Sequence, residues 1–343
     1  MSLSLALVEH GLVPDFITRA GIRRLLAQRL DEESSAAGAA RRQRYLADLR
    51  QAPLAIEQAA ANAQHYEVPT QLYEYCLGKR LKYSSGWWGE GVRNLDEAEE
   101  AMLAKSVAHA GLRDGMDILE IGCGWGSLSL YMAEHFPHAR ITAISNSRTQ
   151  REFITARARQ RGFENLTVLT RDVVDFTTEQ RFDRVVSIEC FEHLRNYHEL
   201  FRRIRIWLKP DGKLWTHIFV HRTYTYPFAT DDADSDDGNW MSRHFFTGGQ
   251  MPAFDLFASC DADLVVEDAV PVNGTHYAKT ARAWLENLDR HRAELLAVLT
   301  APGEDPEVRL NRWRMFFMSC EELWNYGGGE EWLVGHYLLA PRR

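Results

Sequence analysis

The sequence predicts an α/β protein built on a parallel, doubly wound sheet. From about residue 100, short apolar runs typical of strands alternate with patterns typical of helices. The first of these runs ends in a glycine-rich turn that opens directly into a helical pattern. The alternation is missing before residue 100 and after residue 225. We therefore expect a helical N-terminal segment with a lid (1–100), a ligand-binding core (101–225) and a cap (226–343) that also returns the last strands to the core.

The N-terminal segment predicts amphipathic helices up to about residue 64, because apolar side chains recur every three to four positions. Residues 65–88 (HYEVPTQLYEYCLGKRLKYSSGWW) are dense in aromatic side chains. Such rings either pack a core or wall a ligand pocket as a lid. After about residue 225, an acidic, turn-rich loop at 230–240 leads into Trp-rich helical stretches and Gly-rich loops, which we interpret as the cap.

The core elements follow one another in a regular order. Apolar periodicity predicts helices at 95–110, 128–136, 149–162 and 200–208, and strands at 117–122, 140–145, 166–170, 184–189 and 213–220.

Composition narrows the class of protein. The net charge of the 343 residues is −8 and no Lys/Arg block dominates, so we expect no nucleic-acid partner. The five cysteines are scattered singly without metal-ligand spacing, which predicts reduced thiols, a cytoplasmic location and no metal site. No apolar run reaches the roughly 18 residues needed to span a bilayer, and the N-terminus lacks a signal-peptide pattern.

The glycine-rich turn LEIGCGWGS (119–127) indicates a bound ligand, because glycines allow a ligand to approach backbone N–H groups at a helix start. A dinucleotide is disfavoured, since the third glycine of its fingerprint falls on Ser127 and the next strand ends without a carboxylate. A P-loop is excluded because its Gly-Lys-Ser/Thr ending is absent.

Glu120, two positions before Gly122, suits a ligand with a cationic amino group such as the methionine part of S-adenosylmethionine (SAM). The residue pattern therefore favours SAM. Asp172, just after the third strand, is placed to accept a hydrogen bond from an adenine amine. An N-cap of a helix is an equally good interpretation of its spacing.

Glu189, Glu192 and His193 follow the fourth strand, where an open α/β sheet presents groups to its ligand. If the next turn is helical, these three side chains share one face and point toward the pocket. The alternative is a helix start with a solvated histidine. In the first case a carboxylate holds a substrate ammonium, which we assign to Glu192, and the imidazole of His193 accepts its proton.

From about His65 onward the chain resembles the cyclopropane-fatty-acid synthase superfamily of SAM-dependent methyltransferases. The resemblance rests on the aromatic stretch 65–88, LEIGCGWGSLSLYMAE, AISNSRTQREFI, SIECFEHLRNY and HYAKTARAW. Within the superfamily it is more similar to the coclaurine and pavine N-methyltransferases, through KYSSGWW, HFFTGGQMP, VNGTHYAKTARAWL and the tail YGGGEEWLVGHYLL. The resemblance implies a class I SAM-methyltransferase fold: a Rossmann-like, seven-stranded sheet with a helical N-terminal lid and a C-terminal cap.

The resemblance also implies the residues that bind the cofactor. Tyr83 and Ser84 should contact the methionine part of SAM, and Gly122 and Gly124 should line its backbone cradle. The ribose and adenine sides should be held by Ser145, Asn146, Gln150 and Asp172, and the set is completed by Val173 and Ile188.

In cyclopropanating relatives a bicarbonate ion acts as the base and is held by a Cys, a Glu, a His and a Tyr. The last three correspond here to Glu192, His217 and Tyr277, whereas Ser85 occupies the cysteine position. This departure puts bicarbonate in doubt. Trp87, Trp88, Trp324 and Trp332 are expected either to wall the substrate pocket by cation–π contact or to pack the core.

These patterns predict a methyl transfer from SAM to the nitrogen of a small cyclic or aromatic amine, with Glu/His-assisted deprotonation. The alternative is a lipid enzyme that adds a methylene or methyl group to an acyl chain, for which the basic helix at 16–30 offers a membrane contact. A catalytically silent SAM-binding regulator is a third hypothesis, and the intact Glu/Glu/His cluster argues against it. The expected partners are the amine substrate and a second copy of the chain in a homodimer.

Overall fold

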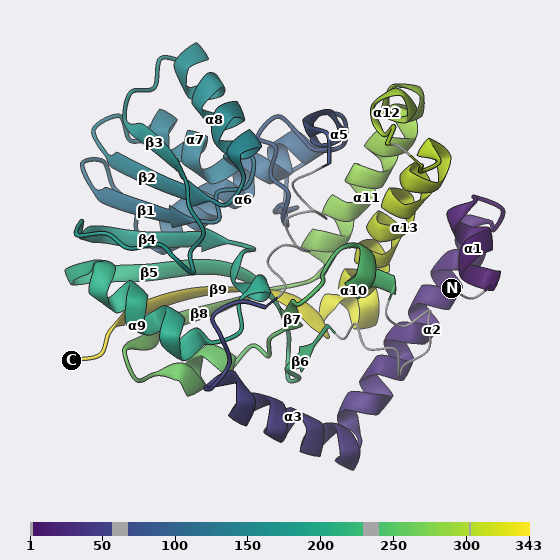
Figure 1. Cartoon of the computed structure of the whole chain (residues 1–343), viewed down its shortest axis with the longest axis horizontal. Helices are drawn as coiled ribbons and strands as arrows, with labels where there is room; N and C mark the ends of the chain where they lie inside the picture. The colour runs from purple at the N-terminus through teal and green to yellow at the C-terminus, as the bar shows by residue number, and fades with distance from the viewer. Residues whose placement is uncertain (1–2, 57–67, 229–239, 302) are drawn as a thin grey trace.

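A seven-stranded sheet forms the centre of the fold in the computed structural model, which describes residues 3–56, 68–228, 240–301 and 303–343. Its order is β3-β2-β1-β4-β5-β9-β8, and β9 runs antiparallel to both of its neighbours (Figure 1). The strands are β1 (Asp117–Ile121), β2 (Arg140–Ser145), β3 (Leu166–Thr170), β4 (Phe182–Ile188), β5 (Leu208–His221), β8 (Leu264–Val272) and β9 (Trp332–Pro341). The predicted seven-stranded sheet is confirmed, and its last two strands come from the C-terminal third.

Alternate residues of each central strand face opposite layers of helices. Ile118 and Val186 pack with α6 (Leu95–Ala110) and α7 (Ser127–His135). Leu119 and Val185 pack instead against α9 (Tyr197–Trp207) on the other face. Because both faces are covered, the parallel strands read as nearly continuous apolar runs.

Local capping fixes where the core helices begin. The side chains of Asn94, Ser147 and Asn196 accept hydrogen bonds from backbone N–H groups at the starts of α6, α8 (Arg148–Gln160) and α9. The four helices predicted in the core are all present, and the predicted helix at 95–110 has the observed bounds.

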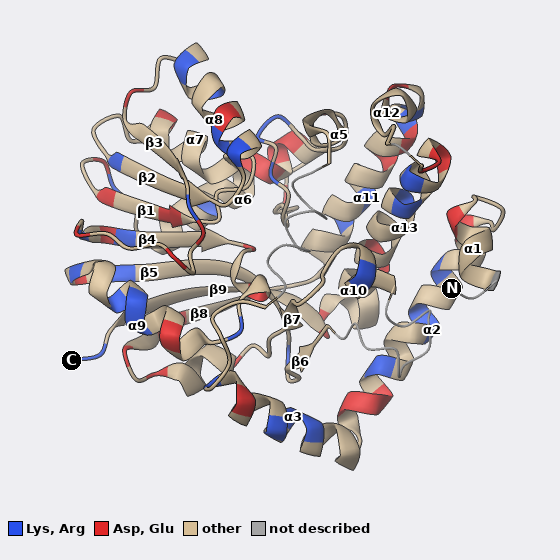
Figure 2. Cartoon of the chain, viewed as in Figure 1, with Lys and Arg blue, Asp and Glu red and all other residues tan. Residues whose placement is uncertain are grey.

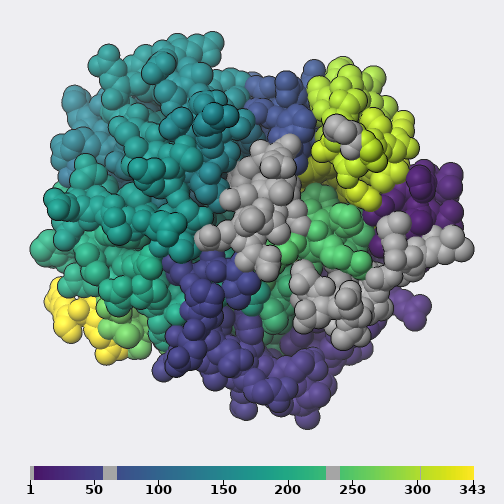
Figure 3. Space-filling model, in the orientation of Figure 1, coloured from purple at the N-terminus to yellow at the C-terminus, as the bar shows by residue number. Residues whose placement is uncertain are grey.

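A helical body covers the edge of the molecule beyond the carboxyl ends of the strands (Figure 1). It contains α1 (Leu3–Glu9), α2 (Asp15–Ser34), α3 (Ala36–Leu49), α5 (Thr70–Cys76), α11 (Thr275–Arg290), α12 (Arg292–Val298) and α13 (Pro306–Asn325). Helix α2 packs along α13, so segments about 300 residues apart in the sequence lie side by side, and the N-terminal helices wrap around the surface in Figure 3.

Ion pairs join α2 to α13, and Figure 2 marks the basic residues of these helices in blue and the acidic ones in red. Arg19 donates to Glu321 at 2.7 Å and to Glu322 at 2.8 Å, and Arg23 donates to Glu322 at 2.8 Å. The basic residues of the segment predicted as a membrane contact are thus partly occupied by ion pairs within the chain.

The remaining elements are short: β6 (Tyr226–Pro227), β7 (Gln250–Met251), α10 (Trp240–His244) and the 3₁₀ turns η1 (Phe191–His193), η2 (Leu256–Cys260) and η3 (Tyr326–Gly329). The predicted acidic loop, apart from Trp240, and the first residues of the aromatic stretch lie outside the described residues. In the part of the chain that is described, no helix has the length and apolar character to cross a membrane.

Candidate active site

Two cavities meet at the carboxyl ends of β1 and β4, where the strand order reverses direction and α/β sheets bind their ligands. The larger has a volume of about 780 Å³ and extends between the sheet and the helical body. The smaller, of about 80 Å³, lies beside β2 and β3. Both are lined by Gly122, Gly124, Gln150, Cys190 and His193. These shared residues mark the junction of the two cavities.

The glycine turn forms a cradle that only residues without a side chain allow. Gly122 has φ +75°, and a Cβ there would approach the Cys190 sulfur at 2.5 Å. Gly124 has φ +51° and faces open space, so a ligand can approach its backbone directly.

Glu120 places an uncompensated carboxyl group on the wall of the larger cavity. It accepts a hydrogen bond from the Ser129 hydroxyl, and burial raises its pKa to about 7. Among the described residues no cation forms an ion pair with Glu120. A ligand ammonium would supply the missing charge, so this wall fits the methionine part of SAM.

The smaller cavity gathers the residues predicted for the ribose and adenine. It is lined by Ser145, Asn146, Gln150, Asp172 and Val173. The Ser145 hydroxyl donates to Gln150 Oε1 at 2.6 Å, which fixes both side chains. Asp172 Oδ1 accepts from the Val174 N–H at 2.9 Å within a turn, so the alternative that it caps a helix is wrong.

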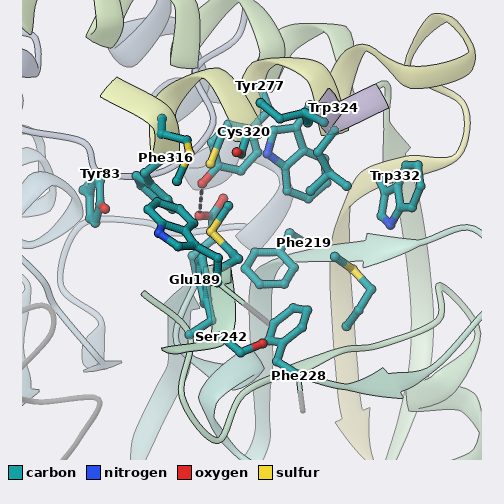
Figure 4. A pocket seen from close by; sticks show the side chains of 18 of the residues that line it. Tyr83, Glu189, Phe219, Phe228, Ser242, Tyr277, Phe316, Cys320, Trp324 and Trp332 are labelled. Atoms are coloured by element: carbon teal, nitrogen blue, oxygen red, sulfur yellow. Dashed lines mark hydrogen bonds between the residues drawn. The ribbon is translucent and has the colours of Figure 1, made fainter. Parts of the chain in front are cut away.

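Glu189 is the centre of a buried hydrogen-bond network at the end of β4. Its side chain is 9% exposed, and its Oε1 lies 3.0 Å from His217 Nε2 and accepts from the Ser85 N–H at 3.3 Å. Tyr277 donates to Oε2 at 2.5 Å (Figure 4). Burial raises the Glu189 pKa to about 7, opposed by the positive charge of Lys82.

The backbone at Glu189 has φ +43°, which is a strained conformation for a residue with a side chain. Such strain concentrates at functional sites. It also breaks the helical geometry that the sequence suggested, because the 3₁₀ turn η1 begins only at Phe191.

Glu189, Glu192 and His193 therefore do not share one face. Glu189 and His193 line the larger cavity, but Glu192 lies behind it, fully buried. Glu192 Oε1 accepts from the Phe219 N–H at 3.1 Å, and its Oε2 has no partner among the described residues. Burial and the charge of Glu189 raise the Glu192 pKa well above its usual value. The expectation that Glu192 faces the substrate is wrong.

His193 stands at the junction of the two cavities, with its ring stacked on Phe246 at a centroid distance of 5.8 Å. Tyr83, Ser84, Ile188 and Tyr277 line the larger cavity, as expected from the sequence. His217 does not line it, but supports Glu189 from β5.

Several aromatic rings line the part of the larger cavity that Figure 4 shows, among them Phe219, Tyr277 and Trp324. Tyr277 and Trp324 stack at 4.7 Å, and Trp332 completes this side. Trp87 and Trp88 do not line the cavity. Trp87 stacks on His276 at 4.0 Å, and Trp88 Nε1 donates to Thr280 Oγ1, so for these two the core-packing alternative is correct.

Three contributors were missed by the sequence analysis. Lys82 is fully buried beside the loop that carries Tyr83 and Ser84. His336 lies 2.9 Å from the second ring nitrogen of His217, and a lone histidine within the apolar run of β9 was its available signal. The third is α2, whose residues line the larger cavity from a distant part of the chain. Among the described residues, no group of three or more His, Cys, Asp or Glu side chains could hold a metal ion.

Comparison with known proteins shows the family of the chain. The sequence profile of the mycolic acid cyclopropane synthetase family matches residues 55–330. The chain belongs to this family. A (S)-coclaurine N-methyltransferase of Thalictrum flavum subsp. glaucum is 33% identical over 98% of the chain and 94% of the relative. The cyclopropane-fatty-acyl-phospholipid synthase of Escherichia coli (strain K12) is 30% identical over 65% of this chain and 55% of its own.

A solved structure of coclaurine N-methyltransferase, bound to N-methylheliamine and S-adenosylhomocysteine (SAH), has a TM-score of 0.92 and 32% identity, covering 98% of both chains. The cyclopropane synthase MmaA2 of Mycobacterium tuberculosis shares the fold with a TM-score of 0.72 at 22% identity, over 85% of this chain and 100% of its own. This member of the family is a SAM-dependent methyltransferase with the class I fold, and SAM is its cofactor.

Proposed function

We propose that the enzyme transfers a methyl group from SAM to the nitrogen of a small cyclic or aromatic amine. The observation that carries this proposal is an aromatic-walled cavity in which Glu189 and His193 stand beside the glycine cradle. Aromatic faces and a buried carboxylate both attract a cationic amine. The relatives named as coclaurine and pavine N-methyltransferases support the same class of acceptor.

SAM, when bound, supplies a methyl group on a sulfonium that is activated for displacement by a nitrogen lone pair. An amine at neutral pH is mostly protonated, so it must lose a proton before it can react. We assign the ammonium-holding role to Glu189 rather than Glu192, because Glu189 lines the cavity. His193 accepts the proton that the amine releases, while Tyr277 and His217 hold the Glu189 carboxylate in place.

The residues that hold the cofactor are proposed from their positions. Tyr83, Ser84 and Glu120 would bind the methionine part, and Gly122 and Gly124 would approach it through backbone. Ser145, Asn146, Gln150, Asp172 and Val173 would surround the nucleoside, and Ile188 would lie between. Bicarbonate stays a hypothesis, since Ser85 points its hydroxyl to the Gly86 carbonyl at 3.0 Å.

The base assignment predicts that His193→Ala lowers kcat by about 10²–10⁴, the usual contribution of a general base. Affinity for SAH should change less than threefold, since the contacts proposed to hold the cofactor come from other residues. Single-turnover kinetics and calorimetry measure the two effects, with His198→Ala on α9 as the control. Unchanged turnover would remove His193 from the mechanism.

One specific observation favours lipid modification as a second candidate. Leu12, between α1 and α2, is 69% exposed, and Phe16 and Ile17 on α2 are 71% and 50% exposed. Ile17 also lines the larger cavity. An apolar surface at the cavity mouth suits a bilayer. Under this alternative the acceptor is an unsaturated acyl chain.

The deciding experiment offers SAM with a trideuterated methyl group to a panel of cyclic and aromatic amines and to unsaturated phospholipid vesicles. We expect mass spectrometry to find amine products that retain three deuterons. Acyl chains that carry label with one deuteron lost would instead indicate methylene transfer, and would refute N-methylation as the main activity.

Two further expectations belong to this proposal. The five cysteines are unpaired, which favours a reducing compartment such as the cytoplasm. A homodimer is proposed as well, and light scattering of the purified enzyme tests it directly.

A further inference from the structure

Lys82 is a fully buried ammonium next to the candidate active site. Its Nζ donates to the Ser84 hydroxyl and to the Ser85 carbonyl, the latter at 2.8 Å. Burial lowers its pKa to about 8, whereas the carboxylates of Glu189 and Glu99 oppose that shift. The group therefore remains mainly protonated at pH 7. Burying an ammonium costs free energy unless it is paired or hydrogen-bonded. A lysine in this position therefore indicates a role in the site.

The loop that carries Lys82 is held rigidly by Glu99 on α6. Glu99 accepts the backbone N–H groups of Gly78, Arg80 and Lys82 at 2.9, 2.9 and 3.3 Å. Two bonds from the Lys82 side chain then fix the next three residues. Rigid supports of this kind hold binding groups in one geometry.

Ser84 is the group whose hydroxyl the Lys82 ammonium orients and polarises. It lines the larger cavity, and one lone pair of its oxygen is taken by the Lys82 ammonium. No acceptor for the Ser84 hydroxyl hydrogen is found among the described residues. A hydroxyl that accepts from a cation becomes a stronger donor, because hydrogen bonds in a chain polarise one another. The free hydrogen is therefore directed at an acceptor from outside the chain.

We propose that Lys82 is a positioning residue that acts through Ser84 to bind the carboxylate of the cofactor's methionine part. This rests on the proposed cofactor site, where Glu120 lines the same cavity and offers the opposite charge to the amino group. Together the two sides would recognise the zwitterionic end of SAM: an anion beside Lys82 and Ser84, and a cation beside Glu120.

The test compares two ligands on Lys82→Met, a nearly isosteric change that removes the charge. SAH carries the amino-acid end, whereas 5′-methylthioadenosine lacks it and fills the nucleoside half only. We expect calorimetry to give a loss of SAH affinity of about 10- to 100-fold, the range of a charge-assisted hydrogen bond. Affinity for methylthioadenosine should stay within twofold.

A double-mutant cycle identifies the route of the effect. If Lys82 acts through Ser84, Lys82→Met should cost less than threefold in SAH affinity when Ser84 is already alanine. Lys79→Met is the matched control, because this neighbouring lysine is 84% exposed. Equal losses for both ligands would mean that Lys82 is merely structural, and no loss would also overturn the proposal. Failure of the unmodified enzyme to bind SAH would instead refute the cofactor site itself.

Discussion

Glu189 and Glu192 are two neighbouring carboxyl groups that the protein treats differently. Glu189 lies on the cavity wall near the positive charge of Lys82 and receives bonds from Tyr277 and the Ser85 backbone. Glu192 is enclosed without a cation among the residues that the structure describes, and the charge of Glu189 raises its pKa further. Pairs of acids with different surroundings take different roles. We therefore expect Glu189 to ionise first and Glu192 to stay protonated to higher pH.

This difference predicts a large loss of activity for one isosteric substitution and a small loss for the other. Glu189→Gln should lower kcat/KM for the amine by about 10²-fold or more, because it removes the charge that we propose holds the ammonium. Glu192→Gln should cost less than 10-fold, because glutamine resembles a protonated acid. Steady-state kinetics on both variants, with circular dichroism to confirm folding, measures this. A larger loss for Glu192→Gln would return the ammonium-holding role to Glu192.

Glu120 predicts how cofactor binding depends on pH. Its pKa in the ligand-free protein is about 7, above the usual 4.5, because burial disfavours the carboxylate. Its contribution to the stability of the ligand-free protein is thus full below about pH 4.5 and is lost as the pH rises through 7. The ligand ammonium needs the ionised form, so SAH affinity should rise between pH 5.5 and 7.5.

Glu120→Gln separates this effect from the other groups that titrate nearby, since Glu99 and Glu189 also have pKa values of about 7. We expect the variant to bind SAH about 10- to 100-fold more weakly at pH 7.5 and with a flatter pH dependence. Calorimetry at a series of pH values gives both quantities. A pH profile identical to that of the unmodified protein would exclude Glu120 as the partner of the ammonium.

At the scale of elements, the strand–turn–helix unit around Gly122 links the fold to binding. Gly122→Ala combines strain at φ +75° with a Cβ 2.5 Å from the Cys190 sulfur. Gly162 is a matched control, since its φ is +73° but no atom lies within 4 Å of the place that a Cβ would occupy. We expect the control to lose about 1 kcal/mol of unfolding free energy and Gly122→Ala about 2–4 kcal/mol.

Cofactor binding should separate the same pair of variants. Gly122→Ala displaces Cys190, which follows Glu189 directly, so SAH affinity should fall at least 10-fold, whereas Gly162→Ala should bind normally. Urea unfolding and calorimetry on the two proteins check these expectations. Equal losses of stability and of SAH affinity in the two variants would show that only backbone strain matters at Gly122, and that its close approach to Cys190 does not.

Local patterns predicted the elements of the core well, and the reason is physical. The strand runs are buried on both faces, and the helix starts are marked by Asn94, Ser147 and Asn196, so short stretches of sequence contain the signal. The same stretches do not determine where Glu192 points. The direction of Glu192 depends on one strained residue, Glu189, and no sequence pattern predicted its positive φ.

Contacts between distant segments explain the other errors. Trp87 and Trp88 turn away from the cavity because His276 and Thr280, about 190 residues later, provide their partners. Likewise, nothing within residues 16–30 indicates that they wall a cavity against a helix near the C-terminus. Only the folded chain brings such distant segments together.

At the scale of the whole molecule, α2 is a wall of the larger cavity that ion pairs with α13 and also packs apolar side chains such as Ile22 and Leu26 against the core. Arg19 and Glu322 are 17% and 10% exposed at this contact, and Arg314 also donates to Asp15 at 3.0 Å near the start of α2. Partly buried pairs of this kind depend on both partners, because removing one leaves the other desolvated and uncompensated. The order of the cavity wall is therefore coupled to a few ion pairs far from the reacting atoms.

Glu322→Ala should release α2 without touching the cofactor site. It leaves Arg23 without this partner and Arg19 with Glu321 alone. We expect the KM for the amine to rise about 5- to 50-fold, because a less ordered α2 weakens amine binding by about 1–2 kcal/mol. Affinity for SAH should change less than twofold, and proteases should cut the segment before α2 faster.

Arg93→Ala, which breaks an ion pair at an 81% exposed arginine, is the control and should change neither the KM for the amine nor the rate of proteolysis. If the affinities for the amine and for SAH fell together, α13 itself would be disturbed, whereas an unchanged KM would mean that α2 is not the wall that holds the substrate.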